Sequence, residues 1–146
     1  MSKKAKNAQP CKLGQQPASN TTFNFQEGCC ADFVLALHRF LNSKDTCFAV
    51  LRGACKRGQV LIHCYLYSGE HDSYLDSINY PNGTTIDEVE DRLDQWREIE
   101  QLEDPCAEAW LDYFEFRDFL REIKRCGYRP DPKVQEAALQ KIGQSH

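Results

Sequence analysis

The sequence predicts an α+β domain in which one helix near the N-terminus packs on a small antiparallel sheet and the C-terminal half is helical. Three observations predict this class. An apolar stripe with helical spacing follows Gly28, two β-favouring runs occupy residues 46–52 and 59–67, and helix signals return after residue 84. A chain of 146 residues, 41% of them hydrophobic, is long enough for one domain with a real core.

Residues 1–22 are expected to form a flexible basic tail, and residues 23–146 a single α+β domain. The tail lacks apolar periodicity and is rich in Lys, Gln, Asn, Ser and Pro. Its four lysines precede the first acid, Glu27, so the rest of the chain has 14 basic and 22 acidic residues, a net charge of −8. Such an acidic body is a poor match for a phosphate backbone, so nucleic-acid binding by the folded part is not expected.

The first helix is expected to begin at Cys30 and to run to about Asn42. At 100° per residue, its apolar residues gather on one side: Phe33, Val34, Leu37, Phe40 and Leu41. Leu35 falls on the opposite side. Asp32 lies in the first turn, away from the stripe, and is interpreted as a residue that interacts favourably with the helix dipole.

Two strands are expected next, at residues 46–52 and 59–67, with a connection from Gly53 to Gly58. Alternate residues of a strand share a face. One face of the second strand is expected to be pure core: Val60, Ile62, Cys64 and Leu66. His63 lies on the other face, which is more polar and aromatic.

Gly69-Glu70 predicts a two-residue type II′ hairpin turn, which sets the register of the following strand. This turn pairs Ser68 with His71. It thereby places His63 opposite Asp76, with Cβ atoms about 5 Å apart, close enough for a carboxylate to orient an imidazole. A four-residue loop is expected to keep this register, whereas a three- or five-residue loop would move Asp76 to the other face.

Three helices are expected in the C-terminal half. Residues 85–88, Thr-Ile-Asp-Glu, form a capping box that opens the first of them. Its inward residues are expected to be Ile86, Val89, Leu93 and Trp96, with its acids solvated. A second, aromatic-rich helix is expected to start at Asp104-Pro105 and to stop at Gly127, and a short helix from about Lys133 to Ile142 ends the chain.

Cys30, His63 and Asp76 can together supply a nucleophile, a base and an orienting group. A helix start stabilises a thiolate through unpaired N–H groups and the helix dipole, so the pKa of Cys30 is expected to lie below the usual value of about 8.5. The oxyanion donor stays open between Gln26, Asn24 and the backbone N–H of Cys30.

These residues also carry a family resemblance. Gly28-x-Cys30-x-Asp32-Phe33 with Ala36-Leu37 resembles small uncharacterised phage and bacterial proteins that contain G-x-C-x-D-F-A-x-A-L, then H-V-x-V, then Y-x-D. More broadly, a cysteine at a helix start, a histidine on a strand and a carboxylate on the next strand resemble the papain-like clan, including its cell-wall endopeptidase and transglutaminase-like branches. The resemblance covers residues 26–80. It implies a papain-like core and hydrolysis, or acyl transfer, at a peptide or isopeptide amide of a peptide or protein substrate.

Two other functions remain open. The chain could be a non-enzymatic interaction or inhibitor protein from a phage or mobile element that binds a protein partner through its acidic helices. An open site around Cys30 favours the enzyme, and a thiol covered by side chains favours the interaction protein. A metal site built from Cys and His residues is the third option, but the chain has no C-x-x-C pair, so neither a metal nor a cofactor is expected.

The eight cysteines would suggest disulfides in a secreted protein, but the first residues have no apolar core to act as a signal peptide. Reduced thiols and a cytoplasmic location are therefore expected. No apolar run approaches the roughly 18 residues of a membrane span.

Overall fold

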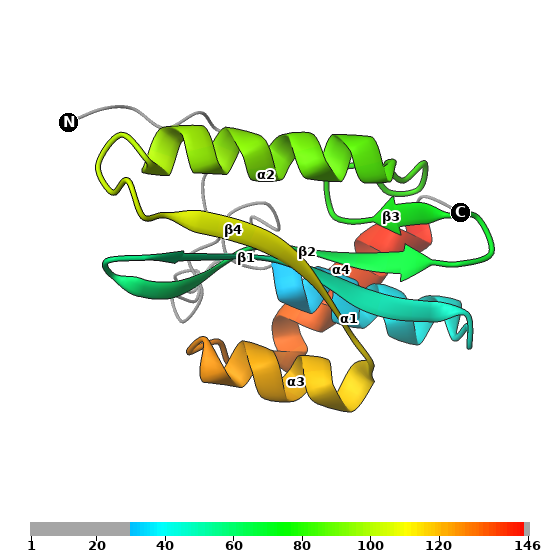
Figure 1. The fold of residues 1–146 in the computed structure, drawn as a ribbon. Coiled ribbons are helices and arrows are strands. Elements are labelled where there is room, and N and C mark those ends of the chain that lie inside the picture. The colour runs from blue at the N-terminus through cyan, green and yellow to red at the C-terminus, as the bar shows by residue number, and fades with distance from the viewer. Residues whose placement is uncertain (1–29, 145–146) are drawn as a thin grey trace.

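The computed structural model describes residues 30–144, which form four helices and a four-stranded antiparallel sheet (Figure 1). The helices are α1 (Cys30–Leu41), α2 (Ile86–Glu100), α3 (Phe116–Arg125) and α4 (Pro132–Gln144). The strands are β1 (Thr46–Cys55), β2 (Gly58–Ser68), β3 (Ser73–Leu75) and β4 (Glu108–Phe114), in the order β3-β2-β1-β4. The predicted α+β class is confirmed. The tail predicted at residues 1–22 lies outside the described residues.

The sheet separates two clusters of buried side chains. Helices α1, α3 and α4 cover one face, and α2 covers the other (Figure 1). On the first face the rings of Phe48 and Phe119 stack with centroids 4.2 Å apart. On the second face Trp96 of α2 is buried against the sheet. Both faces of the sheet are therefore core, which explains why β2 is buried over most of its length.

Strand β1 extends past the point where a connection was predicted, because Gly53 lies within the strand. A Cβ at Gly53 would lie 2.5 Å from the Trp96 ring, so glycine is needed here for close packing and not for a turn. The turn is formed by Lys56 and Arg57, followed by Gly58 with a φ of 104°. The predicted connection from Gly53 to Gly58 is therefore wrong by three residues.

A β-bulge interrupts the alternation of β2 next to His63. Leu51 pairs with His63 but Arg52 pairs with Leu61, so Ile62 is the extra residue. As a result Ile62 packs with the α2 cluster, whereas Cys64 packs with the α1 cluster. The prediction that Ile62 and Cys64 share one face is wrong, because strict alternation does not hold across a bulge.

The apolar stripe of α1 is wider than predicted. Leu35, expected on the far side, is only 3% exposed, whereas Phe40 is 42% exposed. The reason is α4, which packs along α1 and covers a side of the helix that periodicity alone assigned to solvent.

The helix predicted from Asp104 to Gly127 is wrong in its first half. Residues 108–114 form β4, which pairs with β1 from Ala54 to Phe48, and only α3 is helical. An aromatic run this short fits either a strand or a helix, and pairing along the open edge of β1 favours the strand.

The two other C-terminal helices follow the prediction. Thr85 is the N-cap of α2, and its hydroxyl accepts a hydrogen bond from the backbone N–H of Glu88 at 3.3 Å. Val89, Leu93 and Trp96 are buried as expected. Helix α4 begins and ends within two residues of the predicted range.

Candidate active site

The three predicted site residues come together between α1 and the β2–β3 side of the sheet. Cys30 is the first residue of α1, His63 lies on β2, and Asp76 follows the last residue of β3. His63 Nε2 lies 2.7 Å from Asp76 Oδ2, and the His63 ring also hydrogen-bonds with the Cys30 thiol. The imidazole therefore connects a thiol on one side with a carboxylate on the other.

The hairpin that delivers Asp76 differs from the predicted one. Ser68 pairs with Ser73 and Leu66 with Leu75, so the loop has four residues. The register is shifted by two residues, and continuing it would place Asp76 opposite Tyr65. The predicted type II′ turn, and the expectation that a four-residue loop keeps the register, are both wrong. A shift of two residues preserves the face, which is why Asp76 still reaches His63.

Gly69 has a different role from the one predicted. It does not adopt the positive φ that a type II′ turn requires at its first central residue. Its N–H donates to the carbonyl of Asp45 at 3.0 Å, and a Cβ would lie 2.9 Å from the Asp45 carboxylate. The loop therefore packs closely against the turn between α1 and β1, and a larger residue at position 69 would require the exposed Asp45 side chain to move.

A turn after β3 holds the Asp76 carboxylate in place. Oδ1 accepts hydrogen bonds from the backbone N–H groups of Ile78 and Asn79, at 3.1 and 2.7 Å, and from the Asn79 side-chain amide at 3.2 Å. The Asp76 carbonyl accepts from Tyr80 N–H at 3.0 Å. With His63 on Oδ2, both carboxylate oxygens have donors. Asn79 was not predicted as a site residue; the available signal was Asp76 itself, because an Asp side chain often accepts from the backbone N–H two residues later.

The electrostatics favour a charged pair. Burial works to lower the pKa of His63, but its hydrogen bonds to Asp76 and Cys30 outweigh this and raise it above its ordinary value. Burial works to raise the pKa of Asp76, but the hydrogen bond and charge of His63, with smaller contributions from Asn79 N–H and Arg92, lower it. The site therefore favours an imidazolium between two groups that can be anions.

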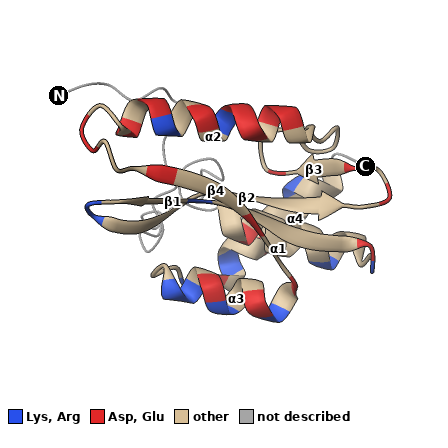
Figure 2. Cartoon of the chain, in the orientation of Figure 1, with Lys and Arg blue, Asp and Glu red and all other residues tan. Residues whose placement is uncertain are grey.

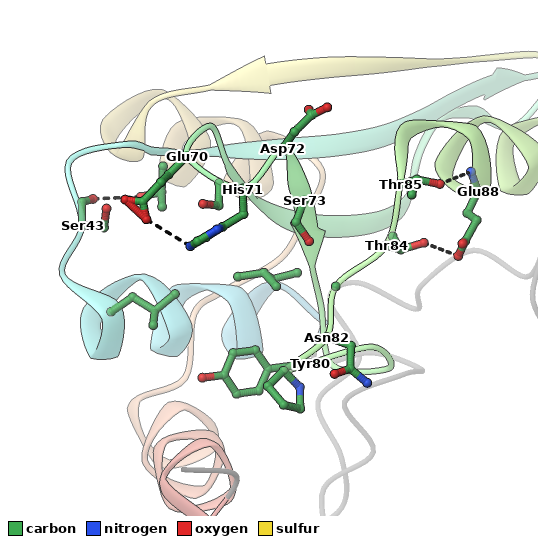
Figure 3. Close-up of a pocket in the computed structure, with 16 residues that line it drawn as sticks. Ser43, Glu70, His71, Asp72, Ser73, Tyr80, Asn82, Thr84, Thr85 and Glu88 are labelled. Atoms are coloured by element: carbon green, nitrogen blue, oxygen red, sulfur yellow. Dashed lines mark hydrogen bonds and ion pairs between the residues drawn. The ribbon is translucent and has the colours of Figure 1, made fainter.

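The site is closed to solvent. Cys30 and His63 are each 1% exposed, and Asp76 is 0% exposed. A hollow of about 690 Å³ lies nearby, between the β2–β3 loop, the end of α1 and residues 80–88 (Figure 3). Leu75 and Tyr80 line it, but Cys30, His63 and Asp76 do not. The Cys30 thiol is therefore covered by other groups, which is the arrangement expected of an interaction protein rather than of an enzyme.

Asp32 has a structural position that was not predicted. It is 0% exposed, and its Oδ1 accepts hydrogen bonds from Asp131 N–H at 3.1 Å and from the Gln135 side chain at 2.9 Å. The carboxylate thus joins the first turn of α1 to the start of α4. Asp32 lies in the first turn of α1 as predicted, and the structure adds a role in joining α1 to α4 that periodicity did not indicate.

Asn24 and Gln26, the predicted oxyanion donors, and Cys29 lie outside the described residues. Residues 30–144 contain no group of three or more His, Cys, Asp or Glu side chains arranged to hold a metal ion. The six cysteines in this range are in no disulfide. No helix in the same range has the length and apolar character to cross a membrane.

The site is thus defined by its geometry alone. Comparison of the chain with protein-family models, with curated proteins and with solved structures finds no match.

Proposed function

We propose that the protein is a thiol-based amide hydrolase or acyl transferase that acts on a peptide or isopeptide bond, with Cys30, His63 and Asp76 as its catalytic residues. The observation that carries the proposal is the hydrogen-bonded line from the Cys30 thiol through His63 to Asp76 Oδ2. A thiol at the first residue of a helix, beside a histidine oriented by a carboxylate, is the arrangement that nucleophilic catalysis needs.

The chemistry follows from these positions. His63 takes the thiol proton, and the Cys30 sulfur attacks the amide carbonyl carbon to form a tetrahedral oxyanion. The C–N bond breaks, the leaving amine takes the proton from His63, and a thioester to Cys30 remains. Water or a second amine then attacks the thioester, giving hydrolysis or transfer. Asp76 holds the ring orientation and stabilises the imidazolium during both steps.

The order of elements supports a papain-like core for this site. The thiol starts α1, the histidine lies on β2, the carboxylate follows β3, and α1 packs on the antiparallel sheet (Figure 1). An aspartate as the third member favours the transglutaminase-like branch of this clan. Within the described residues, the Cys30 backbone N–H is the candidate oxyanion donor, since Asn24 and Gln26 lie outside them.

One observation favours the second candidate, a non-enzymatic interaction protein. The Cys30 thiol is 1% exposed, so a substrate carbonyl reaches it only if the groups that cover it move aside. The exposed face of α2 is rich in Asp and Glu, as Figure 2 shows, and would suit a basic protein surface. Access to Cys30 in the folded state separates the two candidates.

The test is the pH dependence of iodoacetamide modification of each cysteine, measured by mass spectrometry on the folded protein. We expect Cys30 to keep its modification rate at mildly acidic pH, because the neighbouring imidazolium favours the thiolate. Cys106, which is exposed and lies far from His63 in the sequence, is the reference thiol against which the Cys30 profile is compared. His63→Ala should give Cys30 the same pH dependence as Cys106.

Two controls make the result decisive. Cys106→Ser should leave the Cys30 profile unchanged, and circular dichroism should show that each variant is folded. If Cys30 is modified only when the protein unfolds, it is a core residue, and the interaction protein becomes the better account.

A further inference from the structure

The hollow of about 690 Å³ beside the β2–β3 loop lies next to the candidate active site (Figure 3). Leu75, which lines the hollow, directly precedes Asp76. Tyr80 also lines it, and its ring packs edge-on against Phe33 of α1 with centroids 6.3 Å apart. The three proposed catalytic residues do not line the hollow. A group bound there would therefore lie beside the catalytic residues and not on them.

A row of three hydroxyls forms the part of the hollow that belongs to the sheet. Thr46 on β1, Ser68 on β2 and Ser73 on β3 are paired in register, and all three line the hollow. Ser68 is only 9% exposed, and its hydroxyl has no hydrogen-bond partner among residues 30–144. Buried hydroxyls nearly always have a partner. Ser68 therefore offers an unused donor and acceptor to a ligand in the hollow.

The charged side chains around the hollow are acidic. Glu70, Asp72 and Glu88 line it, and within residues 30–144 none of the three has an ion pair with a lysine or an arginine. Asp72 accepts a hydrogen bond from the Tyr67 hydroxyl at 2.7 Å, and Figure 3 shows it pointing away from Glu70. Glu70 has an exposed partner, His71, at 3.0 Å. Glu70 is thus a carboxylate of the hollow that a cationic ligand can reach.

Apolar surface completes the hollow and indicates what kind of cation fits. Four residues supply it: Leu41, Leu75, Tyr80 and Pro81. A bare metal ion has no use for such surface, and residues 30–144 hold no group of three or more side chains arranged for a metal. Long basic side chains place an apolar stem on such surface and extend the charged group to an acceptor. Arginine suits several oxygen acceptors better than lysine does, because its planar guanidinium has five N–H donors.

We propose that this hollow binds the arginine side chain of a peptide. The guanidinium would pair with the Glu70 carboxylate and donate a hydrogen bond to the Ser68 hydroxyl. Its methylene stem would lie on Leu75 and Tyr80. A volume of about 690 Å³ is in the range of pockets that hold whole small ligands, so it leaves room for the neighbouring residues of the peptide.

The binding itself does not require a reactive thiol. Its relation to catalysis rests on the proposed function: if Cys30 cleaves an amide, the hollow makes the substrate a peptide with an arginine near the scissile bond. The two assignments fail separately, because iodoacetamide modification tests the thiol and a binding titration tests the hollow.

The test is a calorimetric titration of the full chain with a pentapeptide that has a central arginine between glycines and blocked ends. We expect saturable binding. The same peptide with citrulline, which keeps the shape of arginine and loses its charge, should bind at least tenfold more weakly. Glu70→Gln and Ser68→Ala should each weaken binding of the arginine peptide by about tenfold or more, the loss expected for one hydrogen bond to a charged group. Circular dichroism and melting temperatures show whether each variant is folded.

Glu90→Gln is the matched control, because it removes the same charge from an exposed position on α2 that does not line the hollow. It should leave the affinity within a factor of two. Equal weakening by Glu90→Gln would mean diffuse attraction to an acidic surface and would overturn the site. An affinity within twofold of the wild type for either Glu70→Gln or Ser68→Ala, equal binding of the citrulline peptide, or no saturation at millimolar peptide would also overturn it. Ethylguanidinium that binds as tightly as the peptide would overturn the assignment of a peptide ligand.

Discussion

Asp32 and Asp76 are both fully buried carboxylates, yet their pKa values move in opposite directions. The pKa of Asp76 is lowered, whereas the pKa of Asp32 is raised to about 7. Burial favours the neutral acid in both cases. The difference lies in the donors. Asp76 has hydrogen-bond donors on both oxygens and a histidine that can carry a charge. Asp32 has two donors on Oδ1, and its buried Oδ2 has no partner among the described residues.

The proposed catalytic role of Asp76 therefore depends on His63 and not on burial. A buried carboxylate without a cation becomes a weak acid and is poorly suited to stabilise an imidazolium. Asp32 is as deeply buried as Asp76. Its two donors come from the start of α4, so its carboxylate joins α1 to α4 and does not orient a histidine.

The largest effect is expected for Asp76→Ala, which removes one partner of a buried ion pair. We expect the free energy of unfolding at pH 6 to fall by roughly 3–5 kcal/mol, because a buried imidazole and two backbone N–H groups lose their acceptor. Urea unfolding measures the change. Glu70→Ala, which removes an exposed carboxylate from the same hairpin, should cost less than about 0.5 kcal/mol. Equal costs for the two variants would mean that the His63–Asp76 pair contributes no stability.

Asp32→Asn should have the opposite effect to Asp76→Ala at high pH, because it should increase the free energy of unfolding. One pKa unit corresponds to about 1.4 kcal/mol, so ionising Asp32 in the folded protein costs at most about 4 kcal/mol at pH 8. The variant avoids this cost and should be more stable than the wild type at pH 8, and its advantage should be smaller, by up to about 3 kcal/mol, at pH 5, where Asp32 is protonated in the folded protein. At pH 5 both side chains carry a hydrogen-bond donor, an O–H in Asp32 and an N–H in the variant, at the position of the Oδ2 atom that has no partner among the described residues.

Urea titrations at the two pH values measure this difference. Asp118→Asn, on exposed α3 surface, is the control and should change stability little at either pH. A gain from Asp32→Asn that is the same at pH 5 and pH 8 would contradict the raised pKa.

The parts of this contrast that depend on local sequence patterns could be predicted, whereas those that depend on contacts between residues far apart in the sequence could not. Cys30, His63 and Asp76 were predicted because a helix start, a strand and the face of the next strand are local patterns. The partners of Asp32 lie 99 and 103 residues away in sequence, so no local pattern indicates them. The same reason explains Leu35, which is covered by α4.

The wrong predictions for the sheet also have both local and non-local causes. The bulge at Ile62 and the four-residue loop after Ser68 change the register without changing which side of the sheet Asp76 occupies. Gly53 was interpreted as a turn residue, but it is small because the Trp96 ring of α2 packs against it, whereas Gly69 lies in a turn of another type than the one predicted. β4 was missed because its partner, β1, is more than 50 residues earlier in the chain.

The wild-type protein should lose stability as the pH rises from 5 to 8. The folded pKa of His63 and that of Asp32 both lie above their unfolded values, so the folded state holds more protons than the unfolded state in this range. Each such proton makes the free energy of unfolding fall by up to about 1.4 kcal/mol per pH unit. Asp76, whose pKa is lowered, acts below pH 4, where its contribution is lost as the pH falls.

Urea midpoints at four pH values between 5 and 8 measure this slope, and Asp32→Asn should reduce it. A wild-type curve that rises with pH across this range would contradict both assignments.

The smallest effect is expected for Gln135→Ala, which removes one of the two donors on Asp32. The hydrogen bond from Gln135 favours the ionised carboxylate, so its loss should raise the pKa of Asp32 further. The cost should therefore be about 1 kcal/mol at pH 8, where the carboxylate is charged, and smaller at pH 5, where it is protonated. Gln140→Ala, on the exposed side of the same helix, controls for the loss of a glutamine and should show no such pH dependence. If Gln135→Ala costs the same at both pH values, Gln135 does not distinguish the two protonation states, and the hydrogen bond from Asp131 N–H is left as the contact that lowers the pKa of Asp32 against the effect of burial.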